Sequence, residues 1–149
     1  MPRADDAVLK TIDAFHRAME NRDLDGIKRV ICKDKRMVWF GTGEVEYQVG
    51  WEQFLGWIEG QLKEVFREKK RVPRIRHTYV SKDFAWVAEK GTWKYIRLNG
   101  EVVETAYRYT FVLRLEGKEW KIIHGHASRG AAAPRLPLRV SHGFRDQNR

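Results

Sequence analysis

The sequence predicts an α+β domain in which three helices from the first half of the chain pack on one face of a curved, mixed but mainly antiparallel β-sheet. Three observations lead to this prediction. Apolar residues recur at helical spacing in three segments before residue 70. Four strand-like segments then follow one another between residues 74 and 128. Short turn sequences separate these four strands, as in an antiparallel meander, and such a sheet curved over helices would enclose a cone.

Two helices are expected at the start of the chain. The first runs from Asp5 to Glu20, with Asp5 or Asp6 as its N-cap. Its apolar stripe consists of Val8, Ile12, Phe15 and Met19. A short second helix begins at Asp23, a residue type that often caps helices. Cys32 follows it and is expected to be structural, because no neighbouring histidine or glycine-rich turn would activate the thiol.

A first strand and a third helix are expected next. The strand covers residues 36–40 and runs into a bend at Gly41 and Gly43. The helix runs from residue 51 to about residue 68, and Pro73 is expected to end the helical part of the chain. Its stripe consists of Trp51, Phe54, Leu55, Ile58, Leu62, Val65 and Phe66, and Gly56 and Gly60 are expected to allow close backbone approach.

The four meander strands are expected in "RIRHTYV", "FAWVAEKGTWKYI", "EVVETAYRYTFVLRL" and "EWKIIHGHAS". The connections at residues 81–83, 98–100 and 116–118 are short and turn-like, and Asn99-Gly100 is the strongest hairpin signal among them. Residues 130–149 lack clean periodicity. We therefore expect one domain at residues 1–129 and a basic tail at residues 130–149.

Composition limits the class of protein. The 149 residues are 42% hydrophobic and include one cysteine, so an intramolecular disulfide is excluded. No apolar run approaches the roughly 20 residues of a membrane helix, and the N-terminus does not resemble a signal peptide, so a cytoplasmic protein is expected. The sequence has no Walker loop, nucleophile elbow or cysteine-rich zinc pattern.

The net charge of +9 is concentrated in two segments. Residues 61–76 carry +5 and residues 129–149 carry +4. Charge runs usually mark solvated faces, and nothing in these segments is typical of base readout. Binding of nucleic acid or another polyanion is therefore the less favoured interpretation.

Four stretches of sequence carry a family resemblance. They are "NRDLDGI", "VWFGTGEVEYQVGWEQF", "RYT" and "WKIIHGHAS", and the resemblance covers about residues 5 to 128. Together they resemble the nuclear transport factor 2-like superfamily, most of all its SnoaL-like domains. The His-x-His-x-Ser of the last strand is similar to that of the calcium/calmodulin-dependent kinase association domain. The resemblance implies a cystatin-like roll, a ligand pocket in the cone and a homodimer. The superfamily hosts enzymes, binders and assembly modules, so fold alone does not assign the function.

The resemblance also frames the search for an acid or base. Isomerases and cyclases of this superfamily resemble one another in placing a carboxylate, often Asp, inside the cone. Between Lys35 and Arg145 this chain has one Asp, Asp83, in an expected turn. An acid or base would then be one of His77, His124, His126, Glu44, Glu46, Glu89 and Glu104. Hydrogen-bond donors to an oxyanion could be Tyr79, Tyr107 or Tyr109.

His124 and His126 lie two residues apart, so a regular strand would point both to one face. With a two-residue loop before the last strand, they would share the buried face with Tyr107 and Tyr109; with a three-residue loop, they would pair with Arg108 and its neighbours on the other face. If the protein is an enzyme, the predicted catalytic residues are His124, His126 and Arg108. The favoured role of the histidines is structural or at a dimer interface, and no metal or cofactor is predicted.

The residues predicted to bind a ligand are Trp39, Trp57, His77, Glu104 and Tyr109. Core packing explains most of the tryptophans, and Trp57 lies off the helix stripe. The favoured function is therefore a small-molecule-binding domain, with proton transfer on a small substrate if there is catalysis. The alternative is a homo-oligomerising association module, and the third interpretation is polyanion binding.

Overall fold

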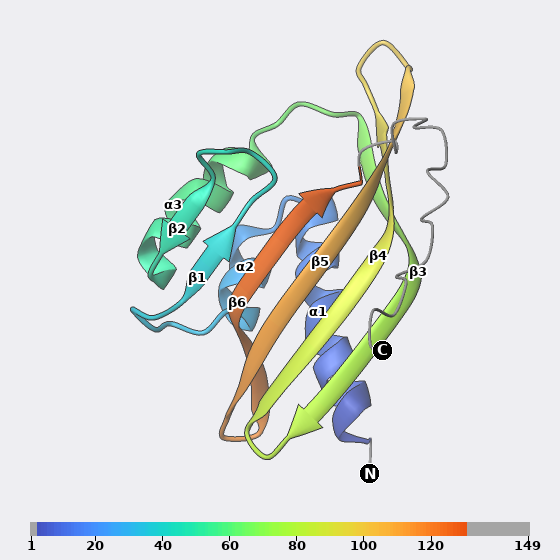
Figure 1. Ribbon diagram of the computed structural model, residues 1–149. Coiled ribbons are helices and arrows are strands. Elements are labelled where there is room, and N and C mark those ends of the chain that lie inside the picture. The colour runs from blue at the N-terminus through green and yellow to red at the C-terminus, as the bar shows by residue number, and fades with distance from the viewer. Residues whose placement is uncertain (1–2, 131–149) are drawn as a thin grey trace, which may run out of the picture.

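The fold consists of three helices and six strands, one strand more than the sequence predicts (Figure 1). The computed structural model describes residues 3–130. The elements are α1 (Ala4–Glu20), α2 (Leu24–Val30), β1 (Val38–Phe40), β2 (Tyr47–Val49), α3 (Trp51–Leu62), β3 (Glu68–Ser81), β4 (Phe84–Ile96), β5 (Val102–Glu116) and β6 (Glu119–Arg129). The additional strand is β2, which pairs antiparallel with β1 across the bend at residues 41–46.

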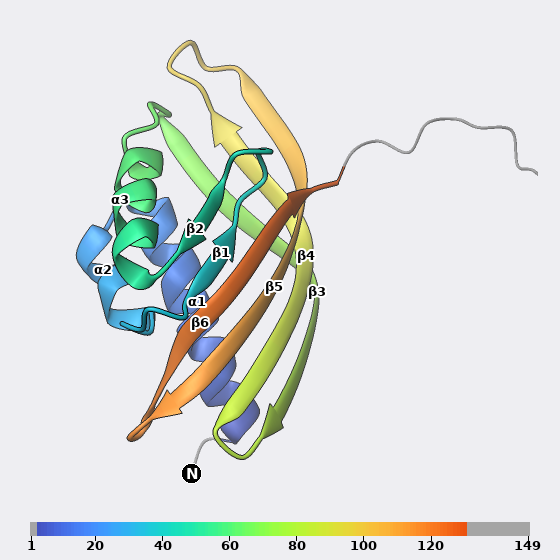
Figure 2. The ribbon, with the colours of Figure 1, turned by 60° about the vertical axis from the view of Figure 1, so that its left-hand side comes forward.

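The six strands form one mixed sheet in the order β2-β1-β6-β5-β4-β3. The strands from β3 to β6 make the expected antiparallel meander, and β1 pairs parallel with β6. The sheet curves around the helices, which all lie on its concave side (Figure 2). The predicted fold class is confirmed. We call the concave side the inner face and the convex side the outer face.

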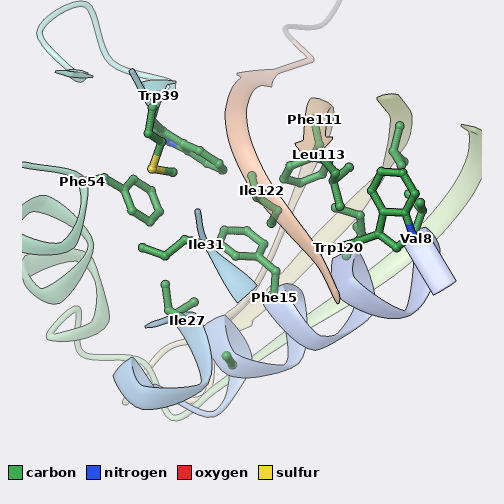
Figure 3. Close-up of a cluster of buried hydrophobic side chains, with 14 of the residues drawn as sticks. Val8, Phe15, Ile27, Ile31, Trp39, Phe54, Phe111, Leu113, Trp120 and Ile122 are labelled. Atoms are coloured by element: carbon green, nitrogen blue, oxygen red, sulfur yellow. The ribbon is translucent and has the colours of Figure 1, made fainter. Parts of the chain in front are cut away.

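The core lies between the three helices and the inner face (Figure 3). Val8, Ile12 and Phe15 of α1 are at most 1% exposed, because the helical spacing predicted from the sequence turns them toward the sheet. Residues of β5 and β6 cover them from the other side: Phe111, Leu113, Trp120 and Ile122. Apolar burial of this extent is the main stabilising term of such a domain.

The helix starts agree with the sequence in one case and differ in the other. Asp23 caps α2, and its Oδ1 accepts a hydrogen bond of 2.9 Å from the Gly26 backbone N–H. In contrast, α1 begins at Ala4 without a side-chain cap, and Asp5 and Asp6 lie in its first turn. There the two carboxylates complement the helix dipole instead of capping it.

The end of the third helix was predicted wrongly. α3 ends at Leu62, and β3 begins at Glu68, before the expected start of the strand. Pro73 therefore lies inside β3, where the pairing with β4 has a bulge, which is a place that a strand can accept proline. Val65, expected on the buried stripe, is 68% exposed. A Cβ on Gly56 or on Gly60 would meet nothing within 4 Å, so neither glycine allows a close backbone approach.

No helix among residues 3–130 is both long enough and apolar enough to cross a membrane. The cytoplasmic location stays a prediction. The tail expected at residues 130–149 lies, apart from Gly130, outside the described residues.

Candidate functional site

A cavity of about 160 Å³ opens at the end of the cone where β6 ends and β3 begins. This volume is many times that needed for one water molecule. Six aromatic side chains from β1, α3, β4 and β5 line it: Trp39, Trp57, Trp93, Tyr95, Tyr107 and Tyr109. Inward-facing residues of β4 and β5 reach the cavity because side chains alternate along a strand. The aromatic walls provide flat, apolar surface for a ligand.

Lys69 is the cationic residue of β3 in this cavity. Its Nζ lies 4.6 Å from the ring centroid of Trp93 and 5.3 Å from that of Tyr95. No carboxylate among residues 3–130 lies within 4.0 Å of this ammonium group, although Glu64 also lines the cavity. Burial lowers the pKa of Lys69. The side chain thus presents a partly dehydrated cation beside two aromatic faces.

Two polar atoms in the cavity wall have no hydrogen-bond partner among the described residues. They are the indole Nε1 of Trp39 and the phenol oxygen of Tyr107. Burial, together with the nearby Glu89 carboxylate, raises the pKa of Tyr107 to about 12, so its phenol keeps the proton. Both atoms are themselves buried, so they are polar groups inside the wall and not exposed contacts for a ligand.

A buried charge cluster lies behind the aromatic wall. Glu89 contacts His16 Nε2 at 2.8 Å, Arg71 Nη1 at 2.7 Å and Arg76 Nε at 2.9 Å. Asp13 Oδ1 lies 2.9 Å from Arg71 Nη2 and 3.0 Å from Arg76 Nη1. Two guanidinium groups therefore face two carboxylates, and the cluster links α1 to β3 and β4.

Burial sets the protonation of His16. Its side chain is fully buried, which lowers its pKa to about 4 even though the Glu89 carboxylate favours the charged form. For Glu89, burial alone would raise the pKa, but His16, Arg71 and Arg76 outweigh it and the pKa is lowered. The cluster therefore holds a neutral imidazole and an ionised carboxylate. The rings of Trp93, Tyr107 and Tyr109 pack against His16 and separate it from the cavity, with ring centroids 5.0–6.3 Å away.

Most of this cluster was not predicted. Glu89 was among the candidate acids, but Asp13, His16, Arg71 and Arg76 were missed. His16 follows Ile12 by four residues and so lies on the buried stripe of α1, which is the signal that could have identified it.

The predicted catalytic residues lie on the outer face, away from the cavity. The loop between β5 and β6 has two residues, and Trp120 and Ile122 point inward as expected. Ile123 is then an extra residue in the pairing, so the strand changes face and His124 and His126 point outward. His126 stands opposite Thr110, and the strand neighbour of Arg108 is Ser128. A hydrogen bond of 2.8 Å joins His124 Nδ1 and the Val38 carbonyl.

The structure divides the predicted ligand-binding residues into two groups. Trp39, Trp57 and Tyr109 lie together in the cavity wall. Trp57 is half-buried against Trp39, with ring centroids 6.3 Å apart. His77 and Glu104 lie on the outer face, where Glu104 pairs with Lys94 at 3.3 Å.

The segment 61–76 does not form a single exposed basic surface. Lys69, Arg71 and Arg76 point to the inside of the cone, where the two arginines are neutralised by carboxylates. Within residues 3–130, no group of three or more histidine, cysteine, aspartate and glutamate side chains could hold a metal ion.

Large apolar side chains are exposed on the outer face. Tyr79 is 57% exposed and Trp86 is 43% exposed, and their rings stack with centroids 6.1 Å apart. Further exposed apolar residues are Ile75 and Phe84 of the same two strands and Phe40 of β1. We call these five residues the outer apolar patch. Exposed apolar surface of this kind often marks a contact with another protein.

Comparison with known proteins agrees with this geometry. The family model of the SnoaL-like domain matches residues 8–133. No curated protein matches the chain significantly. A solved structure of an NTF2-like family protein from Streptomyces avermitilis has a TM-score of 0.76 at 19% identity and covers 86% of this chain and 96% of its own. A nuclear transport factor 2-like superfamily protein from Salmonella enterica has a TM-score of 0.72 at 16% identity, covering 91% and 93%. The association domain of CaMKII from C. elegans has a TM-score of 0.68 at 15% identity, covering 81% and 92%.

Proposed function

The chain belongs to the family of SnoaL-like domains, and we propose that it binds a small, flat carboxylic acid in the cavity at the open end of its cone. One observation carries this proposal: the ammonium group of Lys69 stands among aromatic side chains without a carboxylate of residues 3–130 within 4.0 Å.

The cavity wall defines the shape of the ligand. Aromatic side chains form most of the wall, so a flat apolar body gains contact area and stacking there. Pockets for larger, drug-sized ligands are typically about 300–1,000 Å³. The cavity of about 160 Å³ therefore favours a compound of one or two rings.

The polar groups of the cavity define the chemistry of the ligand. A carboxylate next to Lys69 would neutralise a partly dehydrated cation, and a charge-assisted hydrogen bond is about twice as strong as a neutral one. A neutral ligand of the same shape would use the walls but leave the ammonium group without a partner.

The test is isothermal titration calorimetry with benzoate and 2-naphthoate, each compared with its neutral amide. We expect the acid to bind more tightly than the amide. Lys69→Met should reduce acid affinity about tenfold and leave amide affinity unchanged. Lys70→Met is the matched control, because the neighbouring Lys70 is exposed and points to the outer face. Equal affinity of acid and amide, or equal effects of the two substitutions, would contradict the proposal.

The proposal covers binding and not turnover. His124, His126 and Arg108 lie on the opposite face of the sheet from the cavity, so proton transfer by them to this ligand is not included. Their catalytic role stays a prediction.

Association of two copies through the outer apolar patch is a second candidate function. The exposed, stacked rings of Tyr79 and Trp86 favour it, since a partner would remove them from water. Sedimentation velocity tests it: the protein should be a dimer, and Trp86→Glu should make it monomeric. Leu98→Glu is the control, because Leu98 is 70% exposed in the turn between β4 and β5. A monomeric unsubstituted protein at micromolar concentration would exclude this candidate.

A further inference from the structure

We propose a second ligand site on the outer face, which binds a compound carrying two linked phosphate groups. The site is a hollow of about 480 Å³ around the middle of β4 and β5. Four basic side chains line it: Arg74 from the bulge in β3, Lys90 from β4, Arg108 from β5 and Arg129 from β6. This site opens on the other face of the sheet from the proposed acid-binding cavity, although Ala106, Tyr107 and Arg129 line both.

Small residues make the hollow. Gly91, Ala106 and Gly130 lie between the basic side chains and add almost no side-chain volume. Gly130 packs so closely on Ala106 that a Cβ at position 130 would lie 2.9 Å from the Ala106 Cβ. The bulge after Pro73 leaves Arg74 outside the regular pairing of β3 with β4, and Arg74 lines the hollow from that side.

The basic residues lack internal partners. Lys90 and Arg108 stand directly opposite each other on neighbouring strands, an arrangement that destabilises a sheet when the charges are alike. No carboxylate of residues 3–130 lies within 4.0 Å of any of the four cations. Four residues beyond Lys90 on the same face of β4, Lys94 does have such a partner, Glu104, at 3.3 Å. Unneutralised like charges around a hollow indicate that an anion from outside completes the site.

The number and type of these side chains favour phosphate. Arginine guanidinium groups bind phosphate oxygens through paired N–H donors, and lysine adds a point charge. Two phosphate groups, each with about 1.5 to 2 negative charges near neutral pH, match four cations, whereas a single carboxylate leaves most of the charge uncompensated. The hollow also lacks the aromatic enclosure of the cavity, so it does not fit the flat acid proposed above.

Calorimetric titration with inorganic diphosphate and with orthophosphate tests the site. We expect diphosphate to bind at least about tenfold more tightly, and its affinity to fall as salt is added. Arg108→Gln and Lys90→Gln should each weaken diphosphate binding about tenfold. Lys94→Gln is the matched control on the same face of β4 and should change it little.

Two outcomes would overturn the proposal. One is the absence of diphosphate binding, and the other is an equal effect of Arg108→Gln and Lys94→Gln. If Arg108→Gln changes the sedimentation coefficient while diphosphate does not bind, a second copy of the chain covers these cations instead. Benzoate titration of Arg108→Gln distinguishes this proposal from the acid-binding cavity. Arg108 does not line the cavity, so the affinity for benzoate should be unchanged.

Discussion

The buried His16 should make the stability of the domain depend on pH between neutrality and about pH 5. Burial lowers the pKa of His16 from 6.5 to about 4 in the folded protein. Below pH 6.5 the unfolded chain therefore binds a proton that the folded chain does not, and stability falls as the pH falls. The His16 contribution is fully present above pH 6.5 and is lost progressively toward pH 4.

The size of the effect follows from these two values. At pH 5, the unfolded imidazole is nearly all protonated and the folded one is about nine-tenths neutral, so the free energy of unfolding falls by about 2 kcal/mol relative to pH 7.5. In a domain of this size, that corresponds to roughly 4–8 °C in the melting temperature. Glu89 adds little in this range, because its pKa is lowered and it stays ionised.

Urea unfolding of the protein and of His16→Gln at about pH 7.5 and about pH 5 measures this term. A glutamine amide can still donate to Glu89 but does not titrate, so the substituted protein should lose about 2 kcal/mol less on acidification. His77→Gln is the control: His77 is exposed on the outer face, and its replacement should leave the pH dependence unchanged. If His16→Gln and the unsubstituted protein lose equal stability, then the Glu89 carboxylate fully offsets burial and His16 is charged in the folded state at pH 5.

Two further predictions concern packing and the thiol. A Cβ on Gly125 would overlap the Trp39 ring, so Gly125→Ala should lower the free energy of unfolding by about 1–3 kcal/mol, measured with urea. Gly60 lies in open space on α3, so Gly60→Ala should raise it by about 0.5–1 kcal/mol. Equal effects of the two substitutions would contradict the close packing of Gly125 on Trp39. Burial and the Glu116 carboxylate raise the pKa of the Cys32 thiol to about 12. The folded protein should therefore react with Ellman's reagent at least about a hundredfold more slowly than the protein in denaturant. Equal rates would show that the folded protein has an accessible thiolate.

The sequence was sufficient for most of the fold because local signals agreed with one another. The hairpin signals at residues 98–100 and 116–118 correspond to turns with positive φ at Gly100 and Gly117. The apolar stripe of α1 faces the sheet as predicted. The end of α3 was predicted wrongly because Val65 and Phe66 continue the apolar spacing of the helix, whereas α3 ends at Leu62 and the chain pairs with β4 from Glu68 onward.

The candidate site was harder to predict. Trp39 and Tyr109 were expected because aromatic residues on a sheet can line a cone, and Trp57 was singled out because it lies off the helix stripe; all three lie in the cavity wall. Lys69 was missed, since its neighbours make it resemble part of a solvated basic run. The face of His124 depended on Ile123, an extra residue that reverses the alternation of β6. Strand periodicity assumes regular pairing, so it cannot reveal such a bulge; Gly125 within the strand was the available warning.

The same alternation explains how one strand can serve two sites. On β5, Tyr107 and Tyr109 point into the cavity, while Arg108 between them points to the outer hollow. A substitution of Tyr109 therefore acts on the cavity and one of Arg108 acts on the hollow, whereas Tyr107 lines both. A change in register would exchange the faces, placing a guanidinium group beside the buried His16 and two phenols in water. The cost of that exchange fixes the register of β5, and the fixed register keeps a flat apolar cavity and a basic hollow apart across a single sheet.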